Sequence, residues 1–113
     1  MKTHVFKLPV NYSFEKLGIK GKKYYINELT DKSGFAIVET ETGHETTIIN
    51  HVCDCFYYVL VGKGYFEING IKENFETGDL VVIPAETKFT YKGKCKLLRI
   101  TAPAFYPEQE ETL

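Results

Sequence analysis

The chain has 113 residues, enough for one domain with a single hydrophobic core and too few for two. Its formal net charge of -1 argues against nucleic-acid binding, which needs a concentrated excess of Lys and Arg, so we interpret the lysines at positions 20, 22 and 23 as a solvated face. The sequence shows no signal-peptide pattern and no membrane span, and its three cysteines are an odd number. We therefore expect a cytoplasmic protein with reduced thiols and no membrane partner.

The N-terminal half predicts short strands and one helical turn. Residues 5–9 are typical of an edge strand that ends at a proline. Residues 13–17 predict a single helical turn, with a serine as cap and a following glycine as stop. Weak alternation over residues 22–29 predicts a strand, and residues 35–39 and 46–51 predict two more.

The central stretch carries the strongest strand signals. Residues 56–61 are apolar or aromatic at every position, as in a strand that is covered on both faces. Asn69-Gly70 stands between two strand-like runs and predicts a hairpin, because both central residues of a type I′ turn need positive φ. Residues 79–83 then predict a buried strand, which Pro84 ends.

Two further strands and an acidic tail complete the chain. Residues 88–91 and 95–102 predict strands, and the second alternates so that Leu97 and Arg99 share one face. The tail, residues 103–113, is expected to be extended. Eight or nine short strands separated by turns about ten residues apart indicate an all-β sandwich or barrel.

Residues 43–84 resemble the cupin superfamily, in the runs Tyr57 to Gly64, Phe66 to Gly70 and Gly78 to Pro84. The resemblance implies a double-stranded β-helix, or jelly-roll barrel. It also implies one cupin domain over residues 1–113, with the barrel at about 35–103, an N-terminal segment at 1–30 and a tail at 104–113. Small cupins commonly form homodimers, so a homodimer is expected here as well.

The same resemblance implies a metal site that this chain has lost. The family's first motif runs between two glycines, matched by Gly43 and Gly62, and its metal ligands fall on Ile49, His51 and Cys55. In the second motif a phenylalanine, Phe89, stands where the family has a histidine. Since Ile and Phe side chains have no lone pair to donate, no metal cofactor is expected.

Two interpretations of the nearby cysteines stay open. In one interpretation His51, Cys53 and Cys55 lie on one regular strand, where their spacing of two residues puts the three side chains on the same face. There they would chelate a soft divalent metal, zinc or iron. In the other interpretation Cys53 lies in a bend and both cysteines are small buried hydrophobes.

Several side chains are candidates for a small-molecule site inside the barrel. His51 is either a general acid or base or a hydrogen-bonded part of the wall, since its ordinary pKa lies near neutrality. Tyr57 and Tyr91, with Cys55 and Phe89, are expected to face the interior, where the aromatic rings either stack on a ligand or pack as core. Arg99, the only arginine of the chain, either clamps a carboxylate or phosphate or makes a surface ion pair.

Three functions fit these residues. The first is a binding module that holds a small polar metabolite, a sugar or a carboxylate, with the metal site degraded. The second is an enzyme, either a metal-free sugar isomerase or epimerase that uses His51 with Tyr57 or Tyr91, or a metal-dependent cupin oxygenase or isomerase. The third is a structural role through the dimer.

Overall fold

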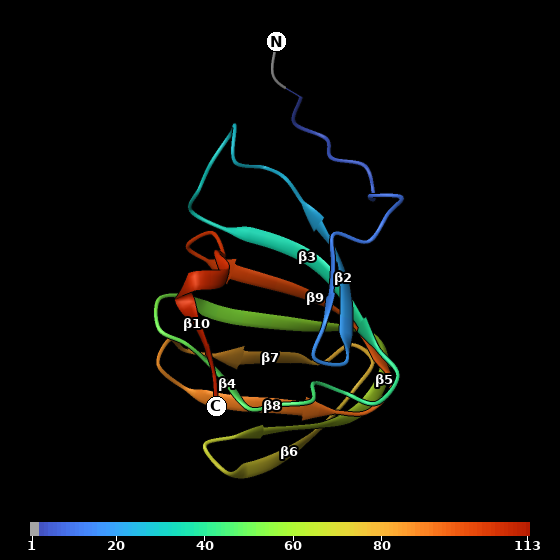
Figure 1. The fold of residues 1–113 in the computed structure, drawn as a ribbon. Helices are drawn as coiled ribbons and strands as arrows, with labels where there is room; N and C mark the ends of the chain where they lie inside the picture. The colour runs from blue at the N-terminus through green and yellow to red at the C-terminus, as the bar shows by residue number, and fades with distance from the viewer. Residues whose placement is uncertain (1–2) are drawn as a thin grey trace.

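The computed structural model describes residues 3–113 as one antiparallel sheet that curls into a barrel (Figure 1). The all-β cupin-like barrel predicted from the sequence is confirmed. The elements in chain order are β1 (Phe14–Lys16), β2 (Ile19–Tyr24), β3 (Gly34–Thr40), β4 (Ile48–Asn50), β5 (Asp54–Ile68), β6 (Ile71–Glu76), β7 (Leu80–Ile83), β8 (Lys88–Lys92), β9 (Cys95–Ala102), the 3-10 helix η1 (Pro107–Gln109) and β10 (Glu110–Thr112). Across residues 3–113 no helix has the length and apolar character that a membrane crossing requires.

The long strand β5 joins the two walls of the barrel. Its first half pairs with β9 and β7 in a wall ordered β1-β2-β3-β9-β5-β7. Its second half pairs with β8 and β6 in a wall that continues through β4 to β10. The pairing with β9 skips a residue between Val59 and Val61, and such a bulge bends a strand from one wall into the other.

An aromatic cluster fills the space between the walls. The rings of Phe66, Tyr57, Phe75, Phe89 and Tyr91 lie with centroids 5.0 to 6.4 Å apart, mostly in tilted or edge-to-face pairs. All five are buried. Because aromatic pairs of this kind add to the stabilisation from apolar burial, the cluster gives the barrel its rigid centre.

The outer side of the first wall also carries apolar side chains. The pairing registers of β3, β9, β5 and β7 align two rows of four across the strands. The rows are Phe35, Ile100, Phe56 and Val82, and Ile37, Leu98, Tyr58 and Leu80. We call these eight residues the outer apolar face. At the β7 end of the two rows Tyr58, Leu80 and Val82 are exposed, with Leu80 59% and Val82 51% accessible.

Some local predictions hold and others fail. Asn69 and Gly70 have φ of 51° and 82°, as the predicted hairpin turn requires. The predicted helical turn at 13–17 is wrong, since Phe14–Lys16 pairs with Ile19–Gly21 and the glycine read as a helix stop belongs to the turn of this hairpin. Residues 5–9 form no strand, and the strand predicted at 22–29 runs from Ile19 to Tyr24 instead. The tail is not simply extended, because it contains η1 and β10.

Candidate interior site

A cavity of about 190 Å³ lies inside the barrel, between the aromatic cluster and the N- and C-terminal segments. His44 and Tyr57 line it from the barrel wall. The side chains of Lys16, Lys23, Arg99 and Glu110 add charge from β1, β2, β9 and β10. The cavity therefore combines an imidazole, a phenol, three cationic groups and one carboxyl group.

His44 is fixed in this cavity by backbone contacts with β8. The backbone N–H of His44 donates to the carbonyl of Tyr91 at 2.8 Å, and the hydroxyl of Thr90 donates to the backbone carbonyl of His44 at 3.2 Å. The ring is 2% exposed and meets the ring of Tyr91 edge-on at 5.8 Å. This turn residue is thus held inward by a strand that follows it by more than forty positions.

The hydrogen bonds of His44 define which ring nitrogen can react. Nδ1 lies 2.8 Å from the carbonyl oxygen of Thr46 and 3.3 Å from the backbone nitrogen of the same residue. Because the shorter contact is to a group that can only accept, Nδ1 carries the proton. The lone pair is then on Nε2. Burial lowers the pKa of His44, and this effect outweighs the opposite effect of the bond to Thr46. His44 is therefore neutral near pH 7 and able to accept a proton at Nε2.

Tyr57 and Tyr91 bring two phenol groups close to this imidazole. Their ring centroids are 5.7 Å apart, Tyr57 lines the cavity, and Tyr91 packs behind it against His44. Neither hydroxyl makes a hydrogen bond to another residue in the part of the chain that the structure describes. Burial raises the pKa of both phenols well above the usual value, so both stay protonated and can donate.

Arg99 is held by two aromatic rings at one side of the cavity. Its register partners on β3 and β5 are Ala36 and Tyr57, both buried, so its side chain also faces inward. The guanidinium carbon lies 4.6 Å from the ring centre of Phe105 and 5.5 Å from that of Phe14.

A Cβ on Gly21 would stand 2.3 Å from Cζ of Phe14, so only a glycine at this position lets that ring close over the strand.

Glu110 reaches the cavity from the last strand. β10 pairs with β4, Glu110 opposite Asn50 and Glu111 opposite Ile49. Burial raises the pKa of Glu110, against the opposite effects of Lys16 and Arg99. This carboxyl group therefore holds a proton to a higher pH than an exposed glutamate.

Most of the residues that the sequence proposed for the interior lie there, and His51 does not. Cys55, Tyr57, Phe89 and Tyr91 are buried inside the barrel, and Arg99 faces the cavity.

The expectation that His51 lies inside is wrong. It follows the end of β4 and its ring is exposed, with Nε2 2.8 Å from Glu111 and Nδ1 3.0 Å from Glu86. These two hydrogen bonds raise the pKa of His51.

The inward residues do not fit the metal that the cupin fold suggests. At the expected ligand positions the interior presents the ring of Phe89 and the thiol of Cys55, whose pKa burial raises to about 12. A thiol that stays protonated is a poor metal ligand. Cys53 is buried and bonded to the carbonyl of Pro103, while His51 points outward. Among residues 3–113 no three His, Cys, Asp or Glu side chains lie together as a metal would need.

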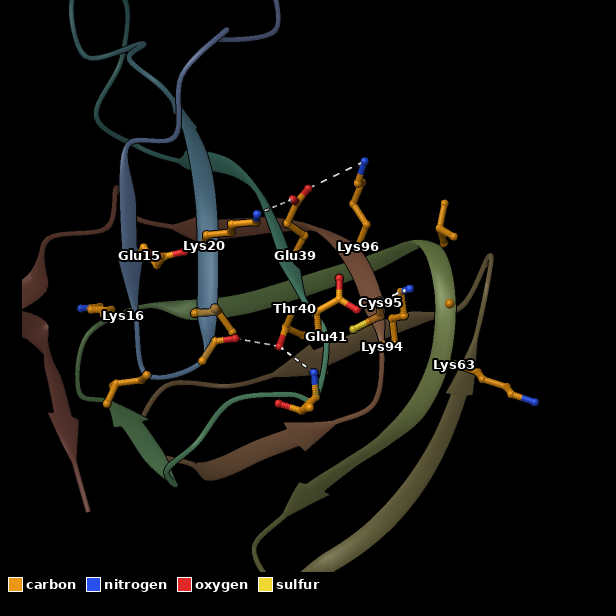
Figure 2. Close-up of a pocket in the computed structure, with 16 residues that line it drawn as sticks. Glu15, Lys16, Lys20, Glu39, Thr40, Glu41, Lys63, Lys94, Cys95 and Lys96 are labelled. Atoms are coloured by element: carbon orange, nitrogen blue, oxygen red, sulfur yellow. Dashed lines mark hydrogen bonds and ion pairs between the residues drawn. The ribbon is translucent and has the colours of Figure 1, made fainter.

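A larger groove of about 950 Å³ opens on the outer surface near the β1–β2 turn, and Figure 2 shows the residues along it. Five of its charged side chains form ion pairs: Glu39 lies 3.7 Å from Lys20 and 3.8 Å from Lys96, and Glu41 lies 3.4 Å from Lys94. Unlike the interior cavity, this groove contains no histidine, tyrosine or arginine. The interior cavity is therefore the better candidate for chemistry.

Sequence reasoning missed four of the cavity residues. The sequence pattern gives His44 no role and places Lys23 on a solvated face. Lys16 lay in the predicted helical turn, and Glu110 in the acidic tail. His44 faces the cavity because Gly43 bridges to Lys92, and Glu110 because β10 pairs with β4, whereas Lys16 and Lys23 reach it from the neighbouring strands β1 and β2. The local signal for His44 was its position directly after the first motif glycine, Gly43.

Solved structures with the same fold include an enzyme. Streptomyces Pac13, described as a nucleoside dehydratase, superposes with a TM-score of 0.86 and 26% identity over 97% of this chain and 92% of that one. Structures of Pac13 with uridine include variants with one histidine or either of two tyrosines substituted, and two of these reach a TM-score of 0.90 at 24% identity. KdgF from Halomonas sp. matches with a TM-score of 0.77 and 20% identity, over 91% of this chain and 96% of that one.

The Cnp3 cupin domain of Schizosaccharomyces pombe matches with a TM-score of 0.68 and 18% identity, over 83% of this chain and 69% of that one. No protein-family model matches the sequence. No curated protein matches it either. These likenesses show that the chain has the cupin fold.

Proposed function

We propose that this protein is a dehydratase that binds a nucleoside-type small molecule in the interior cavity and removes water from it with its own side chains. The proposed reaction is an elimination, in place of the sugar isomerisation considered from the sequence. The proposed base is His44 in place of His51. Simple binding without turnover is the second candidate, because a concave cavity lined by polar groups can hold a ligand whether or not it reacts with it.

One observation carries the proposal. The histidine and the two tyrosines that are substituted in the uridine complexes of Pac13 follow one another at the same two intervals along their chain as His44, Tyr57 and Tyr91 do here. In this chain the ring of Tyr91 packs against those of His44 and Tyr57, and the latter two line the cavity. A shared fold does not by itself imply a shared reaction, but three groups of the same kind at the same intervals support one.

The chemistry of the cavity suits an elimination. Loss of water breaks a C–H bond on one carbon and a C–O bond on its neighbour, so it needs a base and an acid. Nε2 of neutral His44 is the base that takes the proton from carbon. Glu110, whose pKa is raised by burial, is the acid that protonates the departing hydroxyl group, and Tyr57 donates a hydrogen bond that orients the substrate.

The test is a turnover assay with nucleosides, read by mass spectrometry as the loss of one water. We expect His44→Gln to lower the rate by about a hundredfold or more, the usual contribution of a general base. His51→Gln is the matched control, because His51 is exposed and outside the cavity, and it should leave the rate unchanged. Equal rates for the wild type and His44→Gln would refute the base assignment, and binding without any turnover would favour the binding module.

We also infer that the expected homodimer forms through the outer apolar face. An isologous interface places one patch against itself, which suits a face whose rim carries both signs of charge, Glu39 beside Lys20 and Lys96. Leu80→Glu should convert a dimer to a monomer in light scattering. Ile71→Glu, an equally exposed apolar position on β6, should not. A monomeric wild type at high concentration would contradict this inference.

A further inference from the structure

The interior cavity holds more positive charge than its protein surroundings neutralise. Lys16, Lys23 and Arg99 supply three cationic groups, and Glu110 is the one carboxyl group that lines the cavity with them. One carboxyl group cannot balance three cations, and burial also raises the pKa of Glu110. A concave site with an excess of cations attracts anions.

The outer groove shows the contrast. There Lys20, Lys94 and Lys96 each have a carboxylate within 3.4 to 3.8 Å (Figure 2). At the interior cavity, by comparison, neither the half-buried Arg99 and Lys23 nor the exposed Lys16, which lies between the cavity and the outer groove, forms an ion pair with any residue in the described range 3–113. The half-buried Arg99 and Lys23 are thus left without a carboxylate partner, unlike Lys20, Lys94 and Lys96 of the outer groove.

Arg99 is the group best built for an anionic ligand. Its inward direction follows from the register with Tyr57, and the rings of Phe14 and Phe105 hold the plane of the guanidinium. The N–H donors of a guanidinium form a rigid fork that matches a carboxylate or phosphate with two parallel hydrogen bonds. A half-buried fork without protein acceptors is therefore preorganised for an acceptor on a ligand.

We propose that the ligand of the interior cavity carries an anionic group, a carboxylate or a phosphate, which Arg99 holds through its guanidinium with Lys16 and Lys23 alongside. The inference rests on the proposed function in taking the rest of the ligand to be nucleoside-like. It adds a selectivity for the charged form of that ligand over the neutral nucleoside. Because Arg99 and Tyr57 are neighbours across β9 and β5, the anionic group lies next to the reacting end of the cavity.

Calorimetric titration tests the inference with three probes: uridine, uridine 5′-monophosphate and uridine-5′-carboxylic acid. We expect the phosphate, the carboxylate or both to bind the wild type roughly tenfold to a hundredfold more tightly than uridine, the usual contribution of hydrogen bonds to a charged group. The tighter of the two anions identifies which oxyanion the site takes. Equal affinity for all three probes would overturn the inference while leaving the nucleoside proposal in place.

Variants then assign the selectivity to Arg99. Arg99→Gln should reduce the ratio of anion to uridine affinity to near one, and Arg99→Lys should recover part of it, because a lysine keeps the charge and loses the fork. Lys94→Gln, which removes a cation from the outer groove, should keep the wild-type ratio. Thermal unfolding of each variant checks that it folds, and Lys16→Gln gives an independent reduction of the ratio if Arg99→Gln does not fold. An unchanged ratio in folded Arg99→Gln would refute the role of Arg99.

Failure of the nucleoside proposal can be told apart from failure of the anionic inference. If no uridine compound binds, the nucleoside proposal fails, and titration with a sugar acid such as glucuronate then decides the anionic inference. Binding of glucuronate that Arg99→Gln abolishes would support the anion site for another class of ligand, and absence of binding would overturn it.

Discussion

Replacing Tyr57 by phenylalanine separates a role in the site from a role in the core. The change removes one hydroxyl group from a side chain that is 3% exposed. That hydroxyl bonds to no other residue in the described chain, so its removal breaks no hydrogen bond within the protein. A buried, unpaired polar group costs about 1 to 3 kcal/mol, part of which cavity water offsets. We therefore expect the free energy of unfolding of Tyr57→Phe to be unchanged or higher by up to about 1 kcal/mol.

Ligand binding should respond in the opposite direction. If the hydroxyl of Tyr57 donates to the ligand, its loss removes about 1 kcal/mol, which is roughly a fivefold weaker Kd. Because the chain has no Trp, urea unfolding is best followed by far-UV circular dichroism, and binding by titration calorimetry. Tyr106→Phe is the matched control, since its hydroxyl lies at the surface and accepts only from Asn27 at 3.3 Å.

Two results would refute this reasoning. A loss of more than about 1 kcal/mol in the unfolding free energy of Tyr57→Phe would mean that the hydroxyl has a partner in the folded protein. Unchanged affinity for every ligand that the wild type binds would mean that the phenol is only part of the core.

Three further predictions concern the core, the cavity wall and pH. Phe66→Ala should lower the unfolding free energy in urea by about 3 to 5 kcal/mol, because the ring is 1% exposed at the centre of the aromatic cluster. Gly21→Ala should cost about 1 to 3 kcal/mol in the same assay and weaken ligand binding, because the new Cβ displaces the ring of Phe14; wild-type affinity would contradict it. Titrating stability against pH should show opposite effects of two histidines. The lowered pKa of His44 means that the unfolded chain binds more protons, so stability falls as pH drops below about 6.5, and His44→Gln should remove that fall. The raised pKa of His51 gives stability that is present below about 6.5 and lost as pH rises through the folded pKa, and His51→Gln should remove it.

The sequence predicts the parts of this structure that depend on neighbouring residues. Alternation along residues 95–102 correctly gave Arg99 the same face as Leu97, and the Asn69-Gly70 turn set the hairpin. Where the alternation was extended past the end of a strand it failed. The predicted strand at 46–51 ends as β4 at Asn50, so His51 lies beyond the last residue for which strand parity holds.

Non-local pairing determines the rest of the site. His44 faces inward because Gly43 bridges to Lys92 and its own N–H bonds to Tyr91, and no local pattern encodes that contact. Glu110 enters the cavity only because β10 pairs with β4, some sixty residues earlier. The pairing register between distant segments depends on how the whole hydrophobic surface is buried. Local sequence patterns do not encode that register.

The order of strands gives the groups that line the cavity different freedom to change. Lys16 lies on β1 and Glu110 on β10, the two ends of the strand order, whereas Tyr57 lies on β5 and Arg99 on β9, which are paired on both sides. A substitution on an edge strand disturbs one neighbouring strand, while a substitution in the centre disturbs strands on both sides. Descendants of such a barrel can therefore exchange the groups that the terminal strands add to the cavity, while the phenol of Tyr57 and the guanidinium of Arg99 stay in position.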